Sequence, residues 1–114
     1  MIVRKHPLII IDGAHNQDGI DMLKASVKQY LPNRTIVAVI GALRDKDTDY
    51  MVHALSDIFH HVVTITPNNP RALDAKIFAL RWIACGRQAT AAADINDAMS
   101  RAQQLIGEND VILV

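Results

Sequence analysis

Four residues with groups suited to binding a nucleotide, Asp12, Gly13, His15 and Asn16, lie in the segment "PLIIIDGAHNQDGIDML". Its pattern predicts a buried strand, a turn and then a helix. The Asp12 carboxylate can accept two hydroxyl hydrogen bonds, as a ribose requires, and Gly13 permits close backbone approach. His15 and Asn16 would lie beside the helix N-terminus, which favours an anion. The structural alternative is that Asp12 satisfies loop amides, Asn16 caps the helix and His15 is an exposed turn residue.

A second group of charged residues follows another apolar run, in the segment "GALRDKDTD". Its members are Arg44, Asp45, Lys46 and Asp47. They could hold an anionic substrate group, or they could be solvated surface. Asp45 or Asp47 is expected to cap the helix that comes next.

A third polar loop, "TPNNPRALD", supplies Arg71. An Asn in the capping position and a Pro in the first helical position predict a helix that begins at Asn69-Pro70, with Arg71 in its first turn. Arg71 could face the same crevice as the other two loops, or it could be an ordinary surface arginine. Three polar loops at one end of a sheet favour a binding site more than any one of them alone.

Several kinds of site are excluded by what the sequence lacks. The chain contains no G-x-x-x-x-G-K-[ST] phosphate loop, and "GAHNQDG" does not fit G-x-G-x-x-G. No metal site is expected, because His60 and His61 are adjacent and would point to opposite faces of a strand.

Composition limits the chain to a small set of classes. It has 114 residues, half of them apolar, which is enough for one compact domain over residues 1–114. Lys plus Arg equals Asp plus Glu at 12 each, so no basic excess favours nucleic acid. Short apolar runs argue against a membrane span or a signal peptide. We therefore expect a soluble cytoplasmic protein, with its single cysteine, Cys85, as a buried helix thiol.

Alternating strands and helices must position these loops. Val- and Ile-rich runs without polar alternation are typical of parallel strands covered on both faces. These predicted strands are residues 8–11, 35–41, 61–66 and 110–114, with a weaker one at 87–93. The fold class is therefore α/β, with helices on both sides of a mostly parallel sheet.

Helical spacing of apolar residues marks two helices between the predicted strands. One covers about residues 17–31 and buries one side. The other is capped by Asp94 and ends at Gly107. Its predicted apolar face consists of Ile95, Ala98, Met99, Ala102, Leu105 and Ile106.

Three segments together carry a family resemblance that runs from about Pro7 to Val114. "IIIDGAHNQDG" resembles the D-G-A-H-N-P motif that opens the C-terminal domain of folylpolyglutamate synthases and dihydrofolate synthases, relatives of the Mur ligases. "VAVIGALRDKDTDYM" is similar to the family's Gly-x-x-x-Asp-Lys-Asp loop, and "VVTITPNNPRALDA" to its Thr/Pro loop ending in Arg-Ala. The resemblance implies a three-layer Rossmann-like domain of the Mur ligase C-terminal type.

The resemblance also implies an activity, its substrates and its partner domain. Members use ATP and Mg²⁺, held mainly by a P-loop central domain, to convert a folate carboxylate to an acyl phosphate. The amine of L-glutamate attacks that intermediate, giving an amide, ADP and phosphate. By motif match, Asp12 and Gly13 would contact ATP, and His15 and Asn16 would lie near the phosphates or glutamate. Lys46 would orient the glutamate carboxylate, which makes His15 and Lys46 the catalytic candidates.

Three departures from the family pattern limit these expectations. Gln17 replaces the usual Pro, the preceding Pro-Gly-Arg segment is absent, and the chain stops at "NDVILV" before the usual Thr-Gly-Ser turn. We expect a C-terminal domain without its P-loop domain and without activity on its own. A Mur-type peptidoglycan ligase would have a tyrosine-containing form of the first motif. The remaining alternative is a free-standing, non-catalytic α/β binding or assembly module, which could dimerise through an exposed edge of the last strand.

Overall fold

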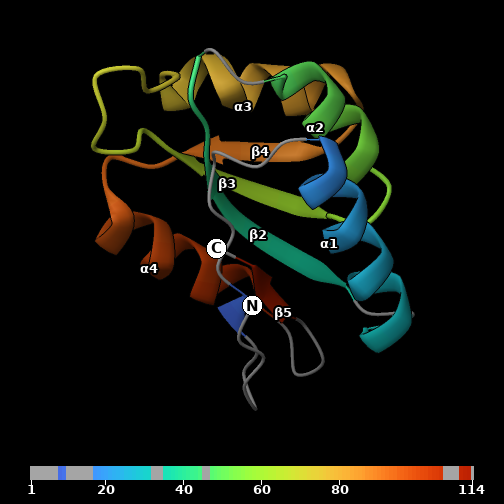
Figure 1. Cartoon of the computed structure of the whole chain (residues 1–114). Coiled ribbons are helices and arrows are strands. Elements are labelled where there is room, and N and C mark those ends of the chain that lie inside the picture. The colour runs from blue at the N-terminus through green and yellow to red at the C-terminus, as the bar shows by residue number, and fades with distance from the viewer. Residues whose placement is uncertain (1–7, 10–16, 32–34, 45–46, 107–110, 114) are drawn as a thin grey trace.

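A computed structural model describes residues 8–9, 17–31, 35–44, 47–106 and 111–113. Strands and helices alternate along this part of the chain (Figure 1). The elements are β1 (Leu8–Ile9), α1 (Gln17–Tyr30), β2 (Ile36–Gly41), α2 (Thr48–Leu55), β3 (His61–Ile65), α3 (Ala75–Ala84), β4 (Gln88–Ala91), α4 (Ile95–Leu105) and β5 (Val111–Leu113). The predicted α/β class is confirmed, and the weaker predicted strand is present as β4.

The described strands form one parallel sheet in the order β1-β5-β2-β3-β4. Ile112 of β5 pairs with Leu8 of β1 on one side and with Val37 of β2 on the other. The last described strand is therefore internal, and the prediction of a dimer through its exposed edge is wrong. The reason is topological: after β4 the chain crosses back to a place between β1 and β2, so β5 has a partner on each side.

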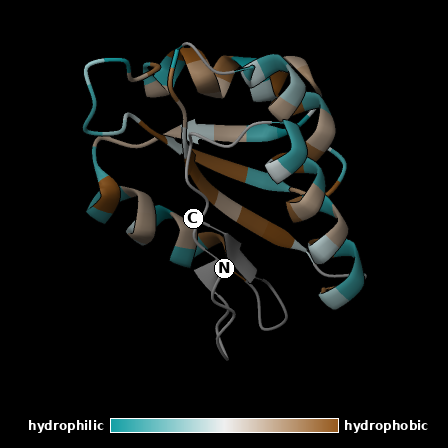
Figure 2. Cartoon of the chain, in the orientation of Figure 1, coloured by the Kyte–Doolittle hydropathy of each residue, from teal (hydrophilic) through white to brown (hydrophobic). Residues whose placement is uncertain are grey.

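Helices cover both faces of the sheet, with α1, α2 and α3 on one side and α4 on the other (Figure 1). All six residues of β2 are buried, and the apolar ones at positions 36–40 alternate between two clusters. Ala38 and Ile40 pack in the same cluster as Trp82 of α3. Val37 and Val39 pack in the cluster of α4. Figure 2 shows the apolar strands between helices that carry hydrophilic residues on their outer sides.

The helices predicted at about residues 17–31 and after Asp94 are present as α1 and α4. In α1, the buried residues Ile20, Leu23 and Val27 form the expected inner side. Asp94 caps α4 as predicted, since its side chain accepts from the backbone N–H of Asp97 at 2.7 Å.

The predicted apolar face of α4 is only partly buried. Ala98 and Ala102 are buried, whereas Ile95 and Leu105 are 46% and 41% exposed. Ile95 and Leu105 are the first and last residues of the helix, whereas Ala98 and Ala102 in its middle pack in the cluster with the sheet. Gly107, the predicted stop, lies outside the described residues.

The predicted start of α3 is wrong. Asn69 and Pro70 lie in a turn, and the helix begins at Ala75 with Asp74 as its cap. Asp74 accepts from the backbone N–H of Lys76 at 2.7 Å. The backbone N–H of Leu73 donates instead to the carbonyl of Ala42 at 2.9 Å, which holds this stretch against the loop after β2 and delays the helix. Arg71 is therefore not in a first helical turn.

The single cysteine, Cys85, lies at the end of α3. Cys85 is half-buried at the C-terminal cap of α3, with its Sγ 4.0 Å from Nδ1 of His53, so the expectation of a buried thiol inside a helix is wrong.

Within the described ranges, no helix has the length and apolar character needed to cross a membrane.

Candidate active-site edge at the carboxyl ends of the strands

The loops that follow β2 and β3 are joined backbone to backbone. The N–H of Arg44 donates to the carbonyl of Arg71 at 2.7 Å. Leu43 and Ala72 form an isolated antiparallel bridge between the same two loops. Two segments that come from different strands therefore behave as one short ribbon at the carboxyl edge of the sheet, where ligands of open α/β sheets bind.

Arg44 and Arg71 are brought together by this ribbon. The Arg44 side chain also donates from Nη2 to the carbonyl of Pro70 at 3.1 Å. Both arginines are exposed at this edge. A guanidinium presents several N–H donors in a planar fork that matches carboxylates and phosphates, so this edge can receive an anionic group.

Gly41, the last residue of β2, permits the close approach of the two loops. A Cβ at this position would lie 3.0 Å from Cγ1 of Ile65 and 3.1 Å from Cδ of Pro67. Both distances are tighter than ordinary van der Waals contact, so a larger residue would push β3 and its loop away. The sequence contained this signal as a glycine directly after a buried Val/Ile run, but its role was not predicted.

Asp47 has a structural role at the start of α2. Its Oδ1 accepts from the backbone N–H of Tyr50 at 3.0 Å, so it is the cap that the sequence predicted with Asp45 as the alternative. Its Oδ2 accepts from Nε2 of Gln17, the first residue of α1, at 3.2 Å. The N-termini of α1 and α2 are therefore held next to each other.

A second contact strengthens the connection between these two helices. The hydroxyl of Tyr50 in α2 donates to Oδ1 of Asp21 in α1. This hydrogen bond raises the pKa of Tyr50 above its usual value, with smaller contributions from burial and from the charges of Asp21, Asp18 and Asp47. The helix that follows the first polar motif and the helix that follows the second are thus fixed relative to each other by two side-chain contacts.

The turn that carries Arg71 is organised by Asn69. Its side-chain oxygen accepts from the N–H of Arg71 at 2.8 Å, and its carbonyl accepts from the N–H of Ala72 at 3.0 Å. An Asn side chain that bonds the backbone two residues on makes this kind of turn without any helix. The Asn-Pro pair was a signal for a turn as well as for a helix start, and the turn prevails here.

Several predicted site residues lie outside the described part of the chain. They are Asp12, Gly13, His15, Asn16, Asp45 and Lys46. Among the described residues, no group of three or more His, Cys, Asp or Glu side chains could hold a metal ion.

The whole chain, residues 1–114, matches the family described as Mur ligase, glutamate ligase domain. The chain belongs to this family. The resemblance seen in the three sequence motifs is therefore confirmed.

Relatives of this Mur ligase domain include enzymes named for folate substrates. The dihydrofolate synthase/folylpolyglutamate synthase of Bacillus subtilis is 30% identical over 114 residues, which cover 99% of this chain and 26% of the relative. The chain thus spans about a quarter of the length of that enzyme.

Two solved structures share the fold of this Mur ligase domain. The Mycobacterium tuberculosis folylpolyglutamate synthase complexed with ADP has a TM-score of 0.79 at 28% identity, covering 92% of this chain and 26% of that one. A bifunctional folylpolyglutamate synthase/dihydrofolate synthase with Mn, AMPPNP and L-glutamate bound has a TM-score of 0.83 at 26% identity, covering 100% of this chain and 27% of that one.

Proposed function

We propose that this chain is the nucleotide- and glutamate-facing C-terminal domain of a cytoplasmic, ATP-dependent folate–glutamate ligase. The observation that carries the proposal is the match of the whole chain to relatives that bear the names folylpolyglutamate synthase and dihydrofolate synthase. One relative holds AMPPNP, Mn and L-glutamate, which are the ligands expected for phosphoryl transfer followed by attack of an amine.

The nucleotide side of the proposed site consists of the first motif. Asp12 and Gly13 would contact the ribose and its neighbourhood, and His15 and Asn16 would lie near the phosphates. The described residue next to them in the sequence, Gln17, bonds to the cap of α2 at 3.2 Å. This contact supports the proposal because it fixes the end of the motif beside the loop that carries Arg44 and Lys46.

The glutamate side of the proposed site consists of the two joined loops. Arg44 and Arg71 would bind carboxylates, and Lys46 would orient the carboxylate next to the reacting amine. Asp45 would contribute to the same loop. Asp47 acts through position alone, because both of its carboxylate oxygens already accept hydrogen bonds within the protein.

The proposed division of labour follows from the charge of the reactants. ATP, with Mg²⁺ held mainly by the P-loop domain, supplies the phosphoryl group that activates the folate carboxylate. Two exposed arginines on one ribbon suit the anionic glutamate, since they offset its carboxylates. Closure of the two domains would exclude water from the acyl phosphate before the amine attacks.

The test pairs this chain with a matched P-loop part of a folate ligase and measures ADP release that depends on both folate and glutamate. Arg71→Gln is expected to lower kcat/KM for glutamate by about 10-fold to 100-fold, as expected for loss of a charged hydrogen bond. Asp12→Ala and His15→Ala should abolish ADP release. Lys28→Gln is the control for loss of a surface cation: Lys28 is exposed on α1, its ion-pair partner is Asp57 at 3.7 Å, and the variant should leave ADP release unchanged.

Failure of the test would favour the other function. If no pairing restores ADP release, the chain is a non-catalytic α/β module that kept the fold. Unchanged kinetics in Arg71→Gln, with release restored, would retain the ligase but remove Arg71 from the glutamate site.

A further inference from the structure

The topology opens a second crevice, at the carboxyl ends of β3 and β4. The helix that follows β3, α3, packs on one face of the sheet, and the helix that follows β4, α4, packs on the opposite face (Figure 1). Adjacent parallel strands whose connections leave to opposite faces create a crevice between their ends, and ligands of open α/β sheets bind in such crevices. The ribbon of Arg44 and Arg71 lies beyond β2 and β3, so this crevice is a different place.

A cleft of about 280 Å³ occupies the crevice. Its floor is residues 91–93, its α3 side includes Asp74 and Lys76, and its α4 side includes Asp97 and Arg101. The cleft is partly open to solvent, and its size suits a small molecule. The four side chains carry two positive and two negative charges.

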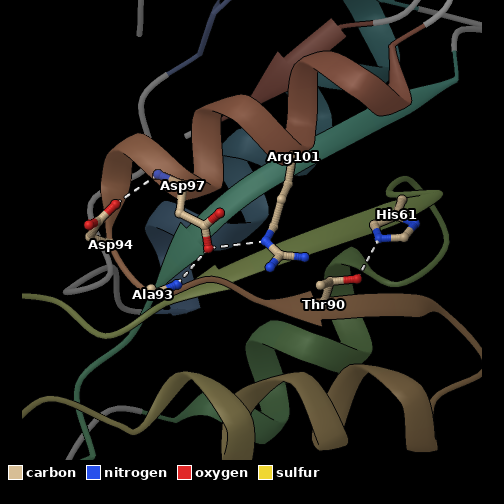
Figure 3. Close-up of polar contacts among 6 residues, drawn as sticks. All are labelled: His61, Thr90, Ala93, Asp94, Asp97 and Arg101. Atoms are coloured by element: carbon tan, nitrogen blue, oxygen red, sulfur yellow. Dashed lines mark hydrogen bonds and ion pairs between the residues drawn. The ribbon is translucent and has the colours of Figure 1, made fainter.

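The two cations of the cleft, Arg101 and Lys76, have N–H donors that are not used by other described residues. Nε of Arg101 donates to Oδ2 of Asp97 at 3.0 Å, and Figure 3 shows the guanidinium extending from α4 toward β4. This bond fixes the direction of the guanidinium, whose two terminal nitrogens have no partner among the described residues. Nζ of Lys76 likewise has no partner in that part of the chain. Positively charged donors are thus available on both sides of the cleft.

Each carboxylate of the cleft accepts hydrogen bonds from the protein through one of its two oxygens. Asp97 accepts from the N–H of Ala93 at 2.9 Å and from Nε of Arg101, both through Oδ2, and these bonds lower the pKa of Asp97. Asp74 accepts from the N–H of Lys76 through Oδ1. The second oxygen of each carboxylate accepts no hydrogen bond from the described residues, so the cleft offers acceptors as well as donors. The N-termini of both helices are already satisfied by their own caps.

We propose that the cleft between α3 and α4 binds a small zwitterion of the α-amino acid type. The ligand's carboxylate would bind Arg101 and Lys76, and its ammonium would bind Asp74 and Asp97. A simple anion fits less well because it would meet the two carboxylates, and a simple cation would meet the arginine and the lysine. His61 and Thr90 on the same face of the sheet are bonded to each other at 3.2 Å and are not needed (Figure 3).

The experiment titrates the chain with glycine and follows backbone amide resonances in two-dimensional NMR. Saturable shifts are expected at Ala91, Ala93 and Asp97, with smaller or no shifts at the ribbon of Arg44 and Arg71. Acetate and methylammonium at the same ionic strength should each bind at least about threefold more weakly, the scale of one exposed charge contact. Glycine is the probe because it lacks the side-chain carboxylate of glutamate, and the resonances of Arg44 and Arg71 separate binding at the ribbon, which belongs to the ligase proposal, from binding in the cleft.

Variants show whether the named side chains hold the ligand. Arg101→Gln and Lys76→Gln should each weaken glycine binding by about threefold, and the double variant should remove saturation. Asp74→Asn keeps a good helix cap while removing a charge, and it should weaken glycine but strengthen acetate. Lys28→Gln is the control with a lost surface cation elsewhere. Acetate binding as tightly as glycine, glycine binding unchanged in the double variant, or no saturable shift would each overturn the proposal.

Discussion

The backbone N–H of Arg44 donates to the carbonyl oxygen of Arg71 across 2.7 Å, which joins the loop after β2 to the loop after β3. The two guanidinium groups are thus placed by backbone contacts, and neither loop can shift without the other. Any change that separates β2 from β3 at their carboxyl ends should therefore shift the positions of both arginines.

Gly41→Ala tests that relationship. The added Cβ would lie 3.0 to 3.2 Å from Ile65 and Pro67, so the two strand ends must separate, at an expected cost of about 1–3 kcal/mol in the free energy of unfolding. Urea denaturation measures the cost, and amide shifts at Arg44 and Arg71 report the displacement. Gly86→Ala is the comparison, because Gly86 has φ +84° in open space and should lose only about 1 kcal/mol through backbone strain. An alanine tolerated at position 41 without either effect would contradict the close approach.

Asp47→Ala should destabilise the chain through loss of the cap of α2. We expect about 1 kcal/mol less stability in urea denaturation, whereas Asp47→Asn should retain most of it because Asn is also a good cap. The side-chain amide signals of Gln17 should move in the Ala variant, since its acceptor is removed. Equal losses in the Ala and Asn variants would mean that Asp47 contributes to stability through its charge and not through its hydrogen bond as a cap.

Asp97 gives a pH dependence with a definite sign. Its pKa is lowered in the folded state by the N–H of Ala93 and by Arg101, so its contribution to stability is present above the unfolded pKa and is lost as the pH falls through the folded value. The stability difference between the parent and Asp97→Asn should therefore shrink on going from neutral pH to below about pH 3. Urea midpoints at the two pH values measure it. A difference that grows in acid would show that the assigned direction is wrong.

Tyr50 should ionise later than an ordinary tyrosine, because its hydroxyl bonds to Asp21. The sequence has two tyrosines, so Tyr30→Phe leaves Tyr50 as the single phenol to follow by ultraviolet absorbance. In that background, Asp21→Asn should bring the pKa of Tyr50 down toward about 10. No movement would mean that the contact between α1 and α2 does not persist in solution.

Much of the fold follows from the spacing of apolar residues. Ile36 to Ile40 form an unbroken buried run, and a short run rich in Val and Ile is typical of a strand covered on both faces. Caps at Asp47 and Asp94 were predictable because they depend on residues three positions away. The family was predictable as well, since three motifs in order identify it.

The remaining features depend on contacts between distant segments. The start of α3 could not be predicted from Asn69 and Pro70, because the bond from Leu73 to Ala42 decides where the chain leaves the turn. The internal place of β5 is equally invisible in its own residues, because it depends on pairing with β1 and β2, which lie far away in the sequence. The cleft of Lys76 and Arg101 was missed for the same reason: its two sides are far apart in sequence and carry ordinary surface charges.

The position of β5 also bears on how the molecule is made. A ribosome releases β1 early and β5 after all the other described strands, yet β5 is the strand that joins β1 to β2. A nascent chain can therefore assemble β2, β3 and β4 with their helices before β5, the pairing partner of β1, has been synthesised. The strand that leads into the first motif would be incorporated last, so a stalled or interrupted translation product would present a half-built sheet with an open edge at β2 for chaperones to protect.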